Sequence, residues 1–78
     1  MIQLNKIGVN VYARASEKSK IIHTFQNAME LSSEFRVRGL DDAETYYRIY
    51  HSEGEEKLGE VTIPKIMVSG YVKEDDIE

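Results

Sequence analysis

The chain has 78 residues, 41% of them hydrophobic and 31% charged, which suits one small domain with a single core. Ten Lys and Arg against fourteen Asp and Glu give a net charge of −4, so nucleic acid, teichoic acid and anionic membranes are poor electrostatic partners. The absence of cysteine excludes disulfides, iron–sulfur clusters and thiolate zinc sites.

The N-terminal segment, residues 1–7, has no basic stretch followed by a long apolar run, so we do not expect it to be a signal peptide. Two interpretations of localisation stay open: a cytoplasmic protein, or a domain cut from a longer secreted protein. No run approaches the ~18 consecutive apolar residues of a membrane span, and we expect no membrane partner.

The first predicted strand, residues 9–13, alternates apolar with polar or aromatic side chains, and the polar stretch 14–19 is typical of a loop. The next segment is ambiguous. Apolar residues recur at helical spacing from Ile21 to Met29, with Ser19 available as an N-cap, which predicts a helix of about three turns. The β-branched residues at 21–25, followed by a turn at 26–28, predict a strand instead.

Strand patterns dominate the rest of the chain. They cover residues 34–38, 45–51, 57–63 and 66–72. Acidic loops separate them at 41–44 and 53–56, where Gly54 can supply a positive φ. We expect these loops to be solvated and to protect sheet edges rather than to bind metal, because they lack the ligand spacing of an EF-hand. Five or six short strands predict a small barrel or sandwich.

Three segments together are similar to one family. Residues 10–25, Asn-Val-Tyr-Ala-Arg-Ala-Ser-Glu-Lys-Ser-Lys-Ile-Ile-His-Thr-Phe, resemble the opening of bacterial SH3-like (SH3b) domains, roughly Asn-Val-Arg-Ser-Gly-Pro-Ser-x-x-Ser-Lys-Val-Ile-Gly-Thr-Leu. Residues 46–49 resemble the family's Trp-Tyr-Lys-Val strand, and residues 70–72 its closing Gly-Trp-Val. The resemblance implies an all-β, SH3-like barrel over residues 1–78, with a strand rather than a helix at 21–25.

The chain departs from the family pattern at several points. Arg14 and Ala15 replace the usual Gly-Pro, His23 replaces a turn glycine, and Tyr stands at both Trp positions. Residues 51–69 are longer than the family's tight hairpin, which predicts an extended hairpin insertion.

Catalysis is not expected from these residues. The only histidines are His23 and His51, and His51 cannot form a dyad with Ser52 because neighbouring side chains on a strand point to opposite faces. We therefore expect no enzyme activity, no cofactor and no metal site.

The aromatic residues suggest a binding surface. With Val11, Phe35, Tyr47, Ile49 and Val72 in the core, alternation sends Arg48 and five candidate ligand-binding residues to the other face. Those five are Asn10, Tyr12, Tyr46, Tyr50 and Tyr71. Either they form an exposed aromatic platform, or the long hairpin folds over them to make a second small core.

The resemblance implies a non-catalytic binding module. In this family such domains target bacterial proteins to cell-wall peptidoglycan or to a peptide, or mediate contacts between proteins. We expect a peptidoglycan peptide bound in a tyrosine-lined groove or, alternatively, a protein–protein interaction or structural domain of a cytoplasmic or multidomain assembly.

Overall fold

Extended strands account for almost all the regular structure of the chain. The computed structural model describes residues 1–78. Its elements, in chain order, are β1 (Ile2–Gln3), β2 (Val9–Tyr12), β3 (Ile21–Phe25), β4 (Glu30–Arg38), β5 (Thr45–Glu53), β6 (Glu56–Leu58), β7 (Val61–Ile63), β8 (Ile66–Lys73) and the 3-10 helix η1 (Glu74–Asp76). The all-β prediction is confirmed.

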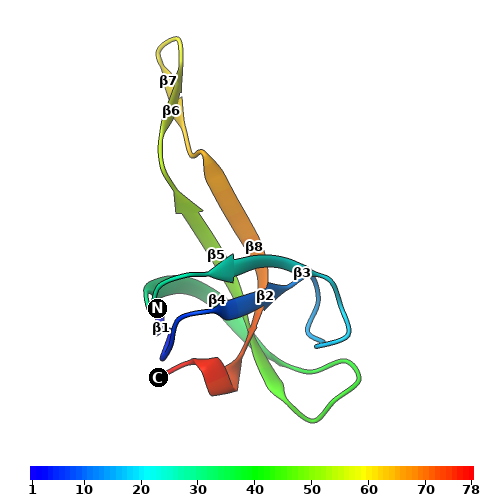
Figure 1. The fold of residues 1–78 in the computed structure, drawn as a ribbon. Coiled ribbons are helices and arrows are strands. Elements are labelled where there is room, and N and C mark those ends of the chain that lie inside the picture. The colour runs from blue at the N-terminus through cyan, green and yellow to red at the C-terminus, as the bar shows by residue number, and fades with distance from the viewer.

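Six of the strands form one antiparallel sheet, in the order β1-β4-β5-β8-β2-β3. The long strand β5 pairs with β4 on one side and with β8 on the other. No pairing joins the two edge strands, β1 and β3, so hydrogen bonds do not close the sheet into a barrel. The two ends of the chain lie side by side, because Leu4 pairs with Ile77 (Figure 1).

The main core lies against one face of this sheet. Strands from both halves of the strand order contribute to it, so the sheet curls around one apolar cluster. Its buried members are Leu4, Val9, Val11, Phe25, Leu31, Ile49, Val68 and Val72. At Gly70, any β-carbon would lie 2.6 Å from the Tyr12 carbonyl oxygen and 2.7 Å from Val11 Cγ1. Strand β2 can therefore pack this closely on β8 only because residue 70 is glycine.

The ambiguous segment 21–25 is a strand, and the helical interpretation of it is wrong. Pairing with β2, from Val9 opposite Phe25 to Tyr12 opposite Ile21, satisfies the backbone groups on one side of this edge strand. Phe25 is thereby buried in the main core. Ser19 does not cap a helix, since its hydroxyl donates to the Ser16 carbonyl oxygen at 2.7 Å. Strand pairing and β-branched side chains together outweigh the helical spacing.

A bulge in β4 explains why the prediction of Phe35 as a core residue is wrong. The register along β5 shifts between Ser33 and Phe35, so that Ser33 pairs with Ile49 and Phe35 with Arg48. One extra residue reverses which side chains face the core. Leu31 is buried before the bulge, whereas Phe35, after it, is 49% exposed.

The predicted insertion is an arm that projects from the sheet, made of residues 51–69 (Figure 1). Beyond the last pair of β5 and β8, Glu53 opposite Ile66, the chain continues into the two-stranded hairpin β6–β7. The single strand predicted over 57–63 is wrong, since the turn at Gly59 and Glu60 divides it; Gly59 has a φ of 67°. The arm makes the molecule elongated, with extents of 47 × 21 × 20 Å.

Candidate functional site

The sheet presents a second face, opposite the main core. Residues paired across antiparallel strands point to the same side. Arg48 of β5 pairs with Phe35 of β4 and with Tyr71 of β8, so these three side chains form one row across that face. Tyr12 lies opposite Tyr71, and Tyr46 alternates with Arg48 along β5. The prediction that Tyr12, Tyr46 and Tyr71 share a face is confirmed.

One end of this face is covered by loops, so Tyr12 and Tyr46 are not the exposed platform residues that the sequence suggests. Together with Ala15 they form a second small core, which we call the covered end. The Tyr46 side chain is 0% exposed, and its ring meets that of Tyr12 edge to face with centroids 6.3 Å apart. The Tyr46 hydroxyl donates to Asp42 Oδ2 at 2.9 Å. Burial, and then this carboxylate, raise the pKa of Tyr46 above its usual value of 10.0.

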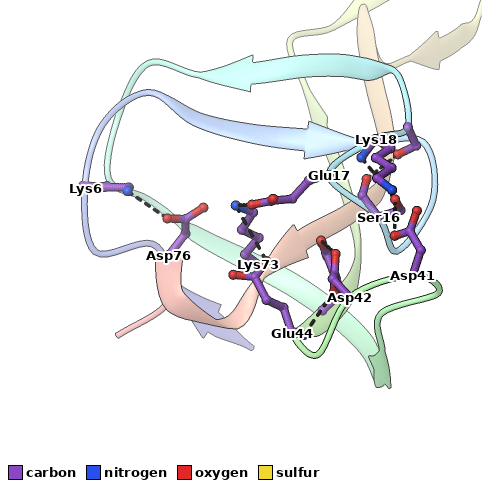
Figure 2. Close-up of polar contacts among 11 residues, drawn as sticks. Lys6, Ser16, Glu17, Lys18, Asp41, Asp42, Glu44, Lys73 and Asp76 are labelled. Atoms are coloured by element: carbon purple, nitrogen blue, oxygen red, sulfur yellow. Dashed lines mark hydrogen bonds and ion pairs between the residues drawn. The ribbon is translucent and has the colours of Figure 1, made fainter.

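The cover consists of the loops 13–20 and 39–44, not of the long hairpin, which points away (Figure 1). The two loops are joined by a backbone hydrogen bond from Leu40 N–H to the Ala15 carbonyl oxygen, 2.9 Å long. In Figure 2, Lys73 of β8 lies between the carboxylates of Glu17 and Glu44, one from each loop. A second small core does form, but it encloses only Tyr12 and Tyr46 of the five candidates, and the prediction that the long hairpin covers it is wrong.

The rest of this face carries five large side chains, which we call the open face: Phe35, Tyr50 and Met67 are exposed, and Arg48 and Tyr71 are half-buried. Tyr50 is 40% exposed and Met67 61%. The Arg48 guanidinium lies 5.1 Å from the centroid of the Tyr71 ring and donates to the Ser69 hydroxyl at 2.6 Å. A cation–π contact and a hydrogen bond thus hold the guanidinium over Tyr71 and Ser69 of β8.

The structure divides the five predicted ligand-binding residues into two groups. Tyr50 and Tyr71 lie on the open face, whereas Tyr12 and Tyr46 are enclosed beneath the loops. Asn10 is half-buried, and its amide oxygen accepts a hydrogen bond from the Thr24 hydroxyl at 2.9 Å, so it serves the β2–β3 pairing.

Sequence reasoning did not select the other three members of the open face. Strand alternation alone places Arg48 and Met67 on this face, but they are not aromatic and were therefore not selected as candidate binding residues. Phe35 could not be found in this way, because the bulge reverses its face and no residue type marks that bulge.

The two histidines pack around one aromatic side chain. The rings of His23 and His51 meet Phe25 edge to face from either side, at centroid distances of 4.8 and 5.3 Å. His51 Nε2 also lies 3.1 Å from a Glu53 carboxylate oxygen. Ser52 is on the opposite face of β5, paired with Met67. Elsewhere, no three His, Asp or Glu side chains gather closely enough to hold a metal ion.

The arm exposes apolar side chains of its own. Leu58 and Val61 face each other across the hairpin and are 59% and 60% exposed. An isolated two-stranded hairpin is only marginally stable in water. The arm is therefore held mainly by its continuity with β5 and β8.

Comparisons with known proteins add no family to this description: no protein-family model, no curated protein and no solved structure matched the chain. A membrane-spanning helix is not among its elements, since none has the length and apolar character that crossing would require.

Proposed function

We propose that the chain is a non-catalytic interaction domain that binds a partner polypeptide on its open face. The observation that carries this proposal is the row Phe35–Arg48–Tyr71, continued by Tyr50 and Met67, on the part of the sheet that no segment of the chain covers. The other end of the same face is sealed by two loops. Phe35, Tyr50 and Met67 are therefore the exposed large apolar side chains at the uncovered end of this face.

The residue types on the open face are those that protein interfaces favour. Interfaces are enriched in aromatic residues, Met and Arg, and depleted in Lys, Glu, Asp, Ser and Ala. Two tyrosines, a phenylalanine, a methionine and an arginine make up this area. Their strand partners in the same rows include Ser32 and Ser69, which add no charge. In a chain with 31% charged residues, this area has one charged side chain, Arg48.

That charge indicates what the partner must offer. The Arg48 guanidinium donates one hydrogen bond to Ser69 and lies over the Tyr71 ring, and it makes no ion pair within the chain. A guanidinium has five donors and binds carboxylates in a planar, bidentate way. The partner surface expected here is a polypeptide with apolar side chains around at least one Asp or Glu.

We also infer that the chain is related to bacterial SH3-like domains. This inference is supported by where the three similar segments lie: β2 with β3, β5, and β8 are neighbours in the sheet order β5-β8-β2-β3. A tyrosine-lined groove for peptidoglycan would need Tyr12 and Tyr46, which the loops enclose. The protein-partner hypothesis is favoured for that reason, and cell-wall targeting becomes the alternative outcome of the same test.

The test is a selection from a phage-displayed random peptide library. We expect enriched peptides to share apolar residues flanking an acidic one, and to lose about 30-fold in affinity for Tyr50→Ala or Phe35→Ala, since an anchor commonly contributes ~2 kcal/mol. Leu40→Ala is the matched control, because Leu40 is 70% exposed but lies on a loop outside the open face. It should bind as the wild type does.

Two results would contradict the proposal. The first is peptide binding that is unchanged in Tyr50→Ala and Phe35→Ala. The second is co-sedimentation of the domain with insoluble peptidoglycan that is lost in Tyr50→Ala, which would assign the open face to the cell wall instead of a polypeptide. Circular dichroism of each variant confirms that the fold is retained.

A further inference from the structure

A cavity of about 520 Å³ lies outside the open face, between the loop 13–20 and the start of the loop 39–44. Small-molecule sites commonly enclose roughly 300–1,000 Å³. The polar side chains that line it are Arg14, Ser16, Lys18, Ser19, Lys20 and Asp41. None of them belongs to the open face, so the cavity is separate from the proposed interaction surface.

The cavity carries a local excess of positive charge in an acidic chain. Arg14, Lys18 and Lys20 make no ion pair, whereas Lys6, Arg36 and Lys73 each contact a carboxylate. The one acid among the lining residues is Asp41, and its Oδ1 accepts a hydrogen bond from the Ser16 hydroxyl at 2.7 Å (Figure 2). Three cations and one carboxylate leave a local charge of 3 − 1 = +2.

The loop that presents these cations is tightly organised. The Ser19 hydroxyl donates to the Ser16 carbonyl oxygen at 2.7 Å and accepts from Arg14 N–H at 3.2 Å. Ser16, itself only 5% exposed, accepts from Lys18 N–H at 3.1 Å. Ala13 N–H donates across the loop to the Lys20 carbonyl oxygen at 2.8 Å. The backbone is thus ordered before any ligand arrives, which lowers the entropy cost of binding.

We propose that this cavity binds a phosphate group carrying two negative charges, either free or as the end of a phosphate monoester. A phosphate monoester has a charge of about −1.5 to −2 at neutral pH and three acceptor oxygens, which matches the +2 excess. Arg14 supplies a planar fork for bidentate contact, and Lys18 and Lys20 supply point charges.

Two alternatives fit less well. A single carboxylate carries one charge and leaves part of the excess unpaired. A nucleic acid needs basic residues along a continuous track, whereas without these three cations the chain's charge would be −4 − 3 = −7. The cavity therefore suits a compact anion.

The test is a titration of the ¹⁵N-labelled domain followed by NMR, with inorganic phosphate and, separately, O-phosphoserine. Ionic strength is held constant with sodium chloride. We expect saturable shifts confined to the amides of residues 13–20 and 39–42. Arg14→Gln, Lys18→Gln and Lys20→Gln should each weaken binding about 2- to 5-fold, and the triple variant about tenfold or more.

The arm provides a matched control. Lys57→Gln and Lys65→Gln remove the same charge from residues far from the cavity and should leave the phosphate affinity unchanged. Tighter binding of O-phosphoserine than of phosphate would identify a monoester as the ligand, and equal affinity would identify the phosphate group alone. Shifts spread over the whole domain, or a triple variant that binds as the wild type does, would overturn the proposal.

Discussion

Replacing Tyr46 with Phe removes one hydroxyl from the covered end and leaves the ring in place. That hydroxyl donates to Asp42 Oδ2 at 2.9 Å, while Asp42 Oδ1 accepts from Glu44 N–H at 3.0 Å. The edge-to-face contact with Tyr12 does not involve the hydroxyl. The substitution therefore isolates the one side-chain hydrogen bond from the Tyr46 hydroxyl to the loop 39–44, and leaves the ion pair of Lys73 with Glu44 in place.

The expected loss follows from the charge of the acceptor. Hydrogen bonds to charged groups contribute ~1.5–3 kcal/mol. Asp42 is only half-buried, so water can take the vacated position, and the lower end of that range applies. We expect the free energy of unfolding to fall by about 1.5 kcal/mol. A domain of this length has a total of roughly 4–12 kcal/mol, which makes such a loss easy to measure.

The assay is urea unfolding followed by far-UV circular dichroism. Tyr50→Phe is the matched control, because the Tyr50 hydroxyl is on the open face and has no hydrogen bond within the chain; its effect should stay within about 0.5 kcal/mol. If Tyr46→Phe is equally neutral, the loop is not held by this bond and the account of the covered end is refuted.

Three further outcomes are expected from the same structure. Burial raises the pKa of Tyr46 above 10.0, so the unfolded chain releases this proton at a lower pH than the folded one. Above pH 10 the free energy of unfolding should therefore fall by up to about 1.4 kcal/mol per pH unit more in the wild type than in Tyr46→Phe. Equal pH dependence of the two proteins in urea unfolding would disprove this. Gly70→Ala should lower the free energy of unfolding in urea by about 1–3 kcal/mol, because the new β-carbon would meet the backbone carbonyl oxygen of Tyr12. A loss below about 0.5 kcal/mol, roughly the scatter of surface variants, would contradict the close packing of β2 on β8. Replacing residues 54–65 by Asn-Gly joins the paired residues Glu53 and Ile66 with a two-residue turn. The shortened chain should keep its β-rich circular dichroism, since no member of the buried core lies within residues 54–65; an unfolded product would show that this segment is required for folding.

Most strand positions could be predicted from local sequence because a strand with one buried face shows alternating apolar and polar side chains in its own segment. The strand at 21–25 is the informative case. Helical spacing alone misleads there, and what decides is the partner β2, which lies elsewhere in the sequence. Phe35 shows the limit of predictions from alternation, since one bulged residue moves this large side chain from the core to the surface.

The candidate site was predictable only in part for a similar reason. Alternation places Tyr12, Tyr46 and Tyr71 on one face correctly, but it does not say which part of a face is covered. The cover depends on contacts between loops, above all Leu40 N–H with the Ala15 carbonyl oxygen and Lys73 with Glu17 and Glu44. The sequence of neither loop has a pattern that predicts such contacts.

The pairing of Leu4 with Ile77 has a practical consequence for handling the molecule. Both termini emerge beside each other, far from the tip of the arm (Figure 1). A tag, a fluorophore or a surface tether fused to either terminus therefore leaves from the same region and does not obstruct the arm. Immobilised through one terminus, the domain would present its projecting hairpin outward, in one orientation, to whatever is flowed over it.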